Sequence, residues 1–145
     1  MKEAENNPIV SLIASIVSPF IMLFGLYVIF HGHYSPGGGF QGGTLLAASI
    51  ILIRLAHSSH TGQLQFPSKL GTPLGSLGVF IYYGTGLAAL WWGGQFLNYA
   101  FLPLAEEISL RRSWGILLVE IGVGLAVMAI LVSIFDDLLE EENHD

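Results

Sequence analysis

Glu120 is the one carboxylate that the sequence places well inside a long apolar segment, residues 113–135. By the rise of an α-helix it lies about 12 Å from the start of that segment. A carboxyl group inside a membrane can exchange a proton for a cation, so an ionisable residue there predicts a functional site. No basic residue of this chain lies at a similar depth, which implies a partner in another subunit. The alternative is a structural glutamate that is protonated or hydrogen-bonded to a neighbouring helix.

Charged residues also stand at the ends of two apolar segments. Arg54 lies near the far end of the second segment, and Asp136 and Asp137 follow the last one. Carboxylates at a helix C-terminus oppose the helix dipole, so either that helix continues or the carboxylates are paired. We hypothesise an ion pair of Arg54 with Asp136 or Asp137. The simpler alternative is an arginine that snorkels to the lipid headgroups.

The histidines raise the question of a haem or a metal site. His31 and His33 end the first apolar segment on one side of the membrane, whereas His57 and His60 end the second on the other. They therefore present no facing pair for a haem, and His57 and His60 lack a third metal ligand. The chain has no cysteine and no nucleophile elbow, phosphate-binding loop or metalloprotease helix. We expect no metal, no cofactor and no enzyme acting alone; a lone small channel is a weaker alternative.

The composition is that of a membrane protein. The chain has 145 residues, of which 52% are hydrophobic and 11% charged, and its mean hydropathy is +0.64. Its net charge of −6, concentrated in the acidic tail, argues against nucleic acid as a partner. Four uncharged or nearly uncharged segments are long enough to cross a bilayer. They predict an all-α membrane protein with a single domain, its helices at about 9–30, 40–57, 70–94 and 113–135, before the tail 136–145.

Four spans place both termini on the same side of the membrane. The start of the chain lacks the pattern of a signal peptide, which favours a multi-pass protein of the cell (inner) membrane with cytoplasmic termini. Small residues line one face of each of the last two spans, Gly75 and Gly78 on the third, Gly122 and Ala126 on the fourth. Such faces allow close packing of helices in a bilayer. We expect each of them to pack against another helix.

A glycine-rich turn joins the first two spans, with the sequence Gly32-His33-Tyr34-Ser35-Pro36-Gly37-Gly38-Gly39-Phe40-Gln41-Gly42-Gly43. Pro36 fixes its own φ, and the three glycines after it can take positive φ without steric cost. A flexible linker does not usually carry a proline and an aromatic residue at its centre. We predict a structured turn from which the second helix starts deep and packs closely, with Phe40 as an anchor.

This turn, between the first two of four spans in a chain of this length, resembles the MrpB (MnhB) subunits of Mrp-type multisubunit Na⁺/H⁺ antiporters. The motif residues are Pro36, Gly37, Gly38, Gly39, Phe40 and Gly43. The resemblance implies a small integral subunit of a membrane complex that exchanges Na⁺ for H⁺. We expect this subunit to act in assembly of the complex, and lining of an ion path is a second candidate role. Its partners would be other antiporter subunits, the lipid bilayer, Na⁺ and H⁺.

Two alternatives to the antiporter remain open at this point. Related modules occur in membrane-bound hydrogenases and sulfur-reducing complexes, where redox chemistry drives ion pumping. A purely structural scaffold is the other alternative, and Glu120 distinguishes it from a subunit that lines an ion path. Glu120 is not part of the family motif and depends on the argument from its position alone.

Overall fold

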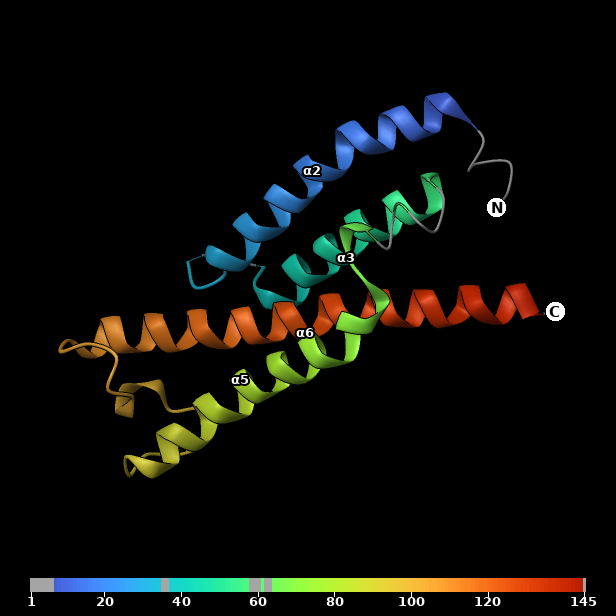
Figure 1. Ribbon diagram of the computed structural model, residues 1–145. Helices are drawn as coiled ribbons and strands as arrows, with labels where there is room; N and C mark the ends of the chain where they lie inside the picture. Colours follow the sequence, from blue (N-terminus) through green and yellow to red (C-terminus); the bar gives the residue numbers. More distant parts are fainter. Residues whose placement is uncertain (1–6, 35–36, 58–60, 62–63, 145) are drawn as a thin grey trace.

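The computed structural model describes residues 7–34, 37–57, 61 and 64–144 (Figure 1). Its long helices are α2 (Pro8–Phe30), α3 (Gly39–Ala56), α5 (Gly71–Trp91) and α6 (Ile108–His144). Two short 3₁₀ helices, η1 (Ser68–Leu70) and η2 (Tyr99–Phe101), stand in the connections. Within the described residues, four helices are long and apolar enough to cross a membrane, and no strand is found. The predicted all-α membrane fold is confirmed.

Three helix ends differ clearly from the ends of the apolar segments, namely the end of α5 and both ends of α6. α5 ends at Trp91, three residues before the end expected from hydropathy, because Gly93 takes a φ of +86° and reverses the chain. The N–H groups of Gly93 and Gly94 donate to the carbonyl groups of Leu90 and Ala89, which is the Schellman arrangement. α6 starts five residues early and continues through the acidic tail to His144. Leucine and glutamate are good helix formers, so the helix does not stop where the apolar segment stops.

The four long helices lie side by side in a single row, in the order α2, α3, α6, α5 (Figure 1). α2 and α3 are antiparallel, α3 and α6 run in the same direction, and α5 is antiparallel to α6 (Figure 1). Along the direction of the helix axes, the start of α2 and the end of α6 point to the same side (Figure 1). A single row buries little of each helix, and large side chains such as Phe20, Leu23 and Phe80 are exposed. In a membrane these faces must contact lipid or other subunits.

Small residues set the distances between the helices. A Cβ atom built at Gly78 of α5 would lie 2.5 Å from the carbonyl oxygen of Gly122 and 2.9 Å from Cβ of Ala126, both on α6. One built at Gly75 would lie 3.5 Å from Ile130, an ordinary contact. The small-residue faces of the last two spans therefore pack against each other, and at Gly78 the atoms in closest contact belong to the backbone of α6. Between α3 and α6 the core consists of Ala47, Ile50 and Val132, with Phe66 from the connection before η1.

Candidate functional site

The N-terminus of α3 is capped by a side chain from another helix. α3 starts at Gly39, and its own N-cap residue, Gly38, offers no side chain to the free N–H groups of the first turn. Instead the N–H of Gly39 donates to Oε2 of Glu120 on α6. A carboxylate at this position satisfies one of the free donors and is stabilised by the positive end of the helix dipole. Glu120 and the glycine turn, two separate features of the sequence, thus form one unit, which we call the Glu120 clamp: Gly38, Gly39 and Glu120.

Both glycines of the Glu120 clamp are required by its geometry. Gly38 has a φ of +94°, which residues other than glycine rarely adopt. A Cβ atom there would also lie 2.7 Å from the carboxyl carbon of Glu120. Gly39 is buried against the backbone and the carboxylate of the same residue. Any larger residue at either position would push the carboxylate away from the helix N-terminus.

The other motif residues are placed around this unit. Gly43, one turn further along α3, packs against α6. A Cβ atom added to Gly43 would lie 2.6 Å from the carbonyl oxygen of Gly124. Gly37 is exposed. Phe40 is 66% exposed, so its side chain anchors nothing within this chain and is free to contact lipid or another subunit. Pro36 lies outside the described residues.

Glu120 is half-buried, and its carboxylate accepts a hydrogen bond from a neutral donor, the Gly39 N–H. Within the described residues it forms no ion pair, and its carboxylate accepts no hydrogen bond besides the one from Gly39. Burial raises the pKa of Tyr99, and the nearby charges of Tyr82 and Glu120 raise it further. The Tyr99 hydroxyl outside the spans therefore stays protonated, as a neutral hydrogen-bond donor close to the Glu120 clamp. A cationic partner from another subunit remains a prediction.

A buried charge network stands at the other end of α3. Arg54 and Asp136 are only 5% and 9% exposed, and Nη1 of Arg54 forms an ion pair with Oδ1 of Asp136. Arg54 also donates through Nη2 to the carbonyl oxygen of Phe66, and the Ser68 hydroxyl donates to Oδ2 of Asp136 at 2.6 Å. Arg54 therefore lies inside the chain and does not snorkel. Asp137 takes no part in this network and is exposed.

Phe66 and Ser68 of this network have no counterpart in the sequence analysis. They lie in the mainly polar connection between the second and third spans, where the apolar Leu64 and Phe66 and the following Pro67 are the signals that could have drawn attention to it. Their contacts tie this connection to α3 and α6, because each of them binds one member of the ion pair.

Among the histidines that the structure describes, His57 and His31 have hydrogen-bond partners within the chain. Nε2 of His57 lies 2.8 Å from the hydroxyl oxygen of Ser11 and 3.1 Å from that of Ser15, and so it links α3 to α2. Nδ1 of His31 lies 3.2 Å from the carbonyl oxygen of Tyr27, one turn earlier. His60 lies outside the described residues. Among the residues that the structure describes, no group of three or more His, Cys, Asp or Glu could hold a metal ion.

Comparison with known proteins places the chain among antiporter subunits. Residues 9–133 match the model of a family described as "Domain related to MnhB subunit of Na+/H+ antiporter". The chain is 31% identical to the B-type subunit of the Na⁺/H⁺ antiporter of Bacillus subtilis, over 98% of this chain and 100% of that protein. It is 30% identical to the corresponding B-type subunit of Alkalihalophilus pseudofirmus, over 88% of this chain and 94% of the relative. An uncharacterized protein of Methanocaldococcus jannaschii is 35% identical over 86% of this chain, which spans 49% of that longer protein.

Proposed function

Because this chain belongs to the family of domains related to the MnhB subunit of Na⁺/H⁺ antiporters, we propose that it is a membrane-spanning subunit of a multisubunit Na⁺/H⁺ antiporter. The observation that carries this proposal is the extent of the family match. It begins at Ile9 in the first turn of α2 and ends at Ser133 in α6, so it reaches into all four spans. Two of the relatives agree with this chain in length as well as in sequence.

The shape of the chain supports assembly with other membrane subunits. A single row of helices leaves apolar side chains exposed along α2 and α5, and Phe40 at the start of α3 is also exposed. Such faces are suited to contact other membrane helices as well as lipid. The start of α2 and the end of α6 point to the same side along the helix axes (Figure 1), and we place that side in the cytoplasm.

Glu120 is the residue that we assign to the ion path. It is the one carboxylate of the four spans that is half-buried and has no opposite charge beside it within the described residues. Its Oε2 accepts the Gly39 N–H at the N-terminus of α3, and its Oε1 accepts no hydrogen bond within the described residues. A proton or a cation bound at Oε1 would therefore leave the bond to Gly39 intact. The Glu120 clamp can therefore keep the carboxylate in place while its charge is neutralised and restored.

The test is Na⁺-driven proton movement in inverted membrane vesicles that carry the complex with Glu120→Gln. Glutamine keeps the shape and an acceptor oxygen for the Gly39 N–H but cannot ionise, so the complex should still assemble. We expect the assembled complex to lose most of its exchange activity. Glu106→Gln makes the same chemical change at an exposed carboxylate before α6 and should leave exchange unchanged.

A native gel separates the two ways in which exchange can be lost. An intact complex without exchange supports a role for Glu120 in the ion path. An intact complex with normal exchange would contradict that role and leave Glu120 as the structural cap of α3. In that case the chain would act in assembly alone.

A further inference from the structure

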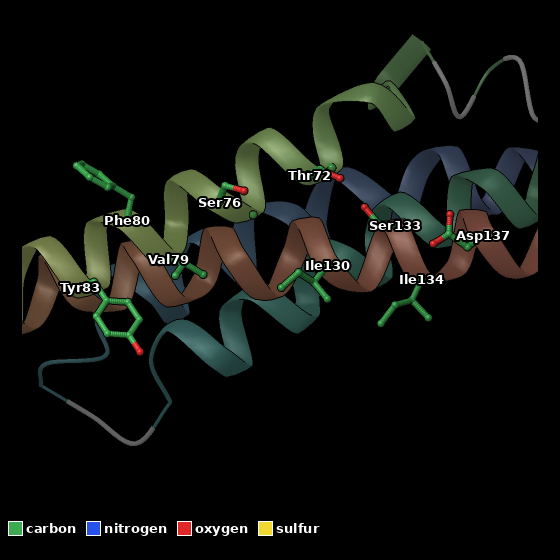
Figure 2. Close-up of a pocket in the computed structure, with 11 residues that line it drawn as sticks. Thr72, Ser76, Val79, Phe80, Tyr83, Ile130, Ser133, Ile134 and Asp137 are labelled. Carbon is green, nitrogen blue, oxygen red and sulfur yellow. The ribbon is translucent and has the colours of Figure 1, made fainter.

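A groove of about 600 Å³ runs between α5 and α6 (Figure 2). It is separate from the Glu120 clamp and from the buried Arg54 network, whose residues do not line it. Its lining residues come from two helices only, so it lies open on the surface of the row. On α5 they are Gly71, Thr72, Gly75, Ser76, Val79, Phe80 and Tyr83, and on α6 Ile130, Ser133, Ile134 and Asp137.

The groove changes in chemistry along its length. Asp137, Ser133 and Thr72 lie at one end, and Phe80 and Tyr83 lie at the other (Figure 2). Asp137 is exposed, and within the described part of the chain no hydrogen bond or ion pair involves its carboxylate. The neighbouring Asp136 is already bound by Arg54 and Ser68. The groove therefore presents one unpaired negative charge, at the end where α5 begins.

The length of the groove matches one leaflet of a bilayer. Thr72 and Tyr83 are separated by about 16 Å along α5, calculated from the rise of an α-helix. Half of the hydrocarbon core of a bilayer is about 15 Å thick. The polar end is level with the start of α5 and lies next to Asp136 and Asp137, which follow the fourth apolar segment, so we place the headgroups at this level. The aromatic end then lies near the middle of the membrane.

We propose that this groove binds an acyl chain of a phospholipid whose headgroup carries an ammonium group, and that this ammonium group pairs with Asp137. The apolar part of the groove accommodates the chain, and the hydroxyl groups of Thr72 and Ser133 stand where the ester region of the lipid lies. Lys69 lies one turn before Thr72 and is exposed, in a suitable place for the lipid phosphate. A zwitterionic phospholipid such as phosphatidylethanolamine meets all of these requirements.

A helix of another subunit fits the groove less well. Such a helix is about 10 Å wide and would follow α5 and α6 across the whole membrane. The groove instead ends at Phe80 and Tyr83, which are large and exposed side chains. A single acyl chain is narrow enough to lie between the two helices and ends where the groove ends.

The test uses the purified, delipidated complex in a nonionic detergent, with phosphatidylethanolamine or phosphatidylcholine of the same acyl chains added back. The bound lipid per complex is measured by lipid extraction and mass spectrometry. We expect a preference for phosphatidylethanolamine, because its primary ammonium donates hydrogen bonds to a carboxylate and the trimethylated one cannot. Asp137→Asn should reduce this preference about 1.5- to 5-fold, the range that exposed ion pairs give.

Two further variants make the outcome specific to the groove. Ser76→Phe fills the middle of the groove and should reduce binding of both lipids, whereas Glu106→Gln, at the opposite interface, should change neither. An unchanged preference in Asp137→Asn would overturn the proposal. So would a photo-crosslinker at Ser76 that captures a protein subunit in native membranes, since a partner helix would then occupy the groove.

Discussion

The tight contact at Gly78 allows a prediction with a control on the same helix. An alanine at Gly78 would place its Cβ 2.5 Å from the Gly122 carbonyl oxygen and 2.6 Å from the Ala126 nitrogen. Real Cβ atoms essentially never come closer than 3.0 Å to such atoms, and both of these belong to the backbone. α5 and α6 must therefore move apart by roughly 0.5 Å. The same change at Gly84, six residues along α5, meets no atom within 4 Å.

The difference between the two variants follows from packing. Both substitutions gain up to about 1 kcal/mol of helix propensity, and this term cancels in the comparison. A separation of this size loses a quarter or more of the dispersion energy of each contact between α5 and α6. Overpacking of this kind typically costs about 1–3 kcal/mol. We therefore expect Gly78→Ala to be less stable than Gly84→Ala by about that amount.

The assay is the resistance of the complex to SDS. The purified complex in mild detergent is titrated with SDS, and the release of this chain is followed on a native gel. Gly78→Ala should be released at a lower SDS fraction than the wild-type chain, and Gly84→Ala at the same or a higher fraction. Equal resistance of the two alanine variants would refute the reasoning, because it would mean that α5 and α6 are not held at this distance by Gly78.

Two more predictions concern the ends of α3. Gly38→Ala should weaken the complex by about 1.5–3 kcal/mol more than Gly93→Ala in the same SDS titration. Both glycines have a positive φ, so the backbone strain is similar, but only Gly38 adjoins Glu120, and an added Cβ there displaces the charged hydrogen bond of Glu120. Equal losses would show that backbone strain alone is responsible. Arg54→Gln should lower stability by about 3–5 kcal/mol, because it leaves Asp136 buried without its partner. The double variant Arg54→Asp with Asp136→Arg reverses the ion pair and should recover part of the stability that each single variant loses. A double variant no more stable than the single variants would contradict a direct pair.

The sequence predicted the helices and the residues of the candidate site, but it did not predict which of these residues contact one another. Glu120 and the glycine turn were each recognisable, one by its depth in an apolar segment and the other by its composition. Their contact depends on the register of α3 against α6, which no local pattern encodes. The structure shows this register as a constant offset, with Gly39 beside Glu120 and Gly43 beside Gly124. Only the tertiary arrangement could reveal that α3 is capped by another helix.

The ends of helices and the connections were the least predictable parts. Hydropathy marks where the chain is apolar, but α6 continues for nine residues beyond Phe135 because its acidic tail still favours the helix. Phe66 takes part through its backbone carbonyl, which accepts from Arg54, and Ser68 through its hydroxyl, which donates to Asp136. Neither contact is marked by a residue type or a spacing in the sequence. Phe40 has the aromatic character of an anchor, yet its exposed ring shows that any anchoring partner is outside this chain.

Because the helices form a single row, the chain is a layer only one helix thick, and lipid or other subunits can contact it on both faces. A wall one helix thick is only about 10–12 Å across. α3 and α6, in the middle of the row, each present one surface to either side (Figure 1). A neighbour that presses on one side of these helices therefore displaces the same backbone that a neighbour on the other side touches. Mechanical communication across the chain needs no long pathway, because the two sides share the same two helices.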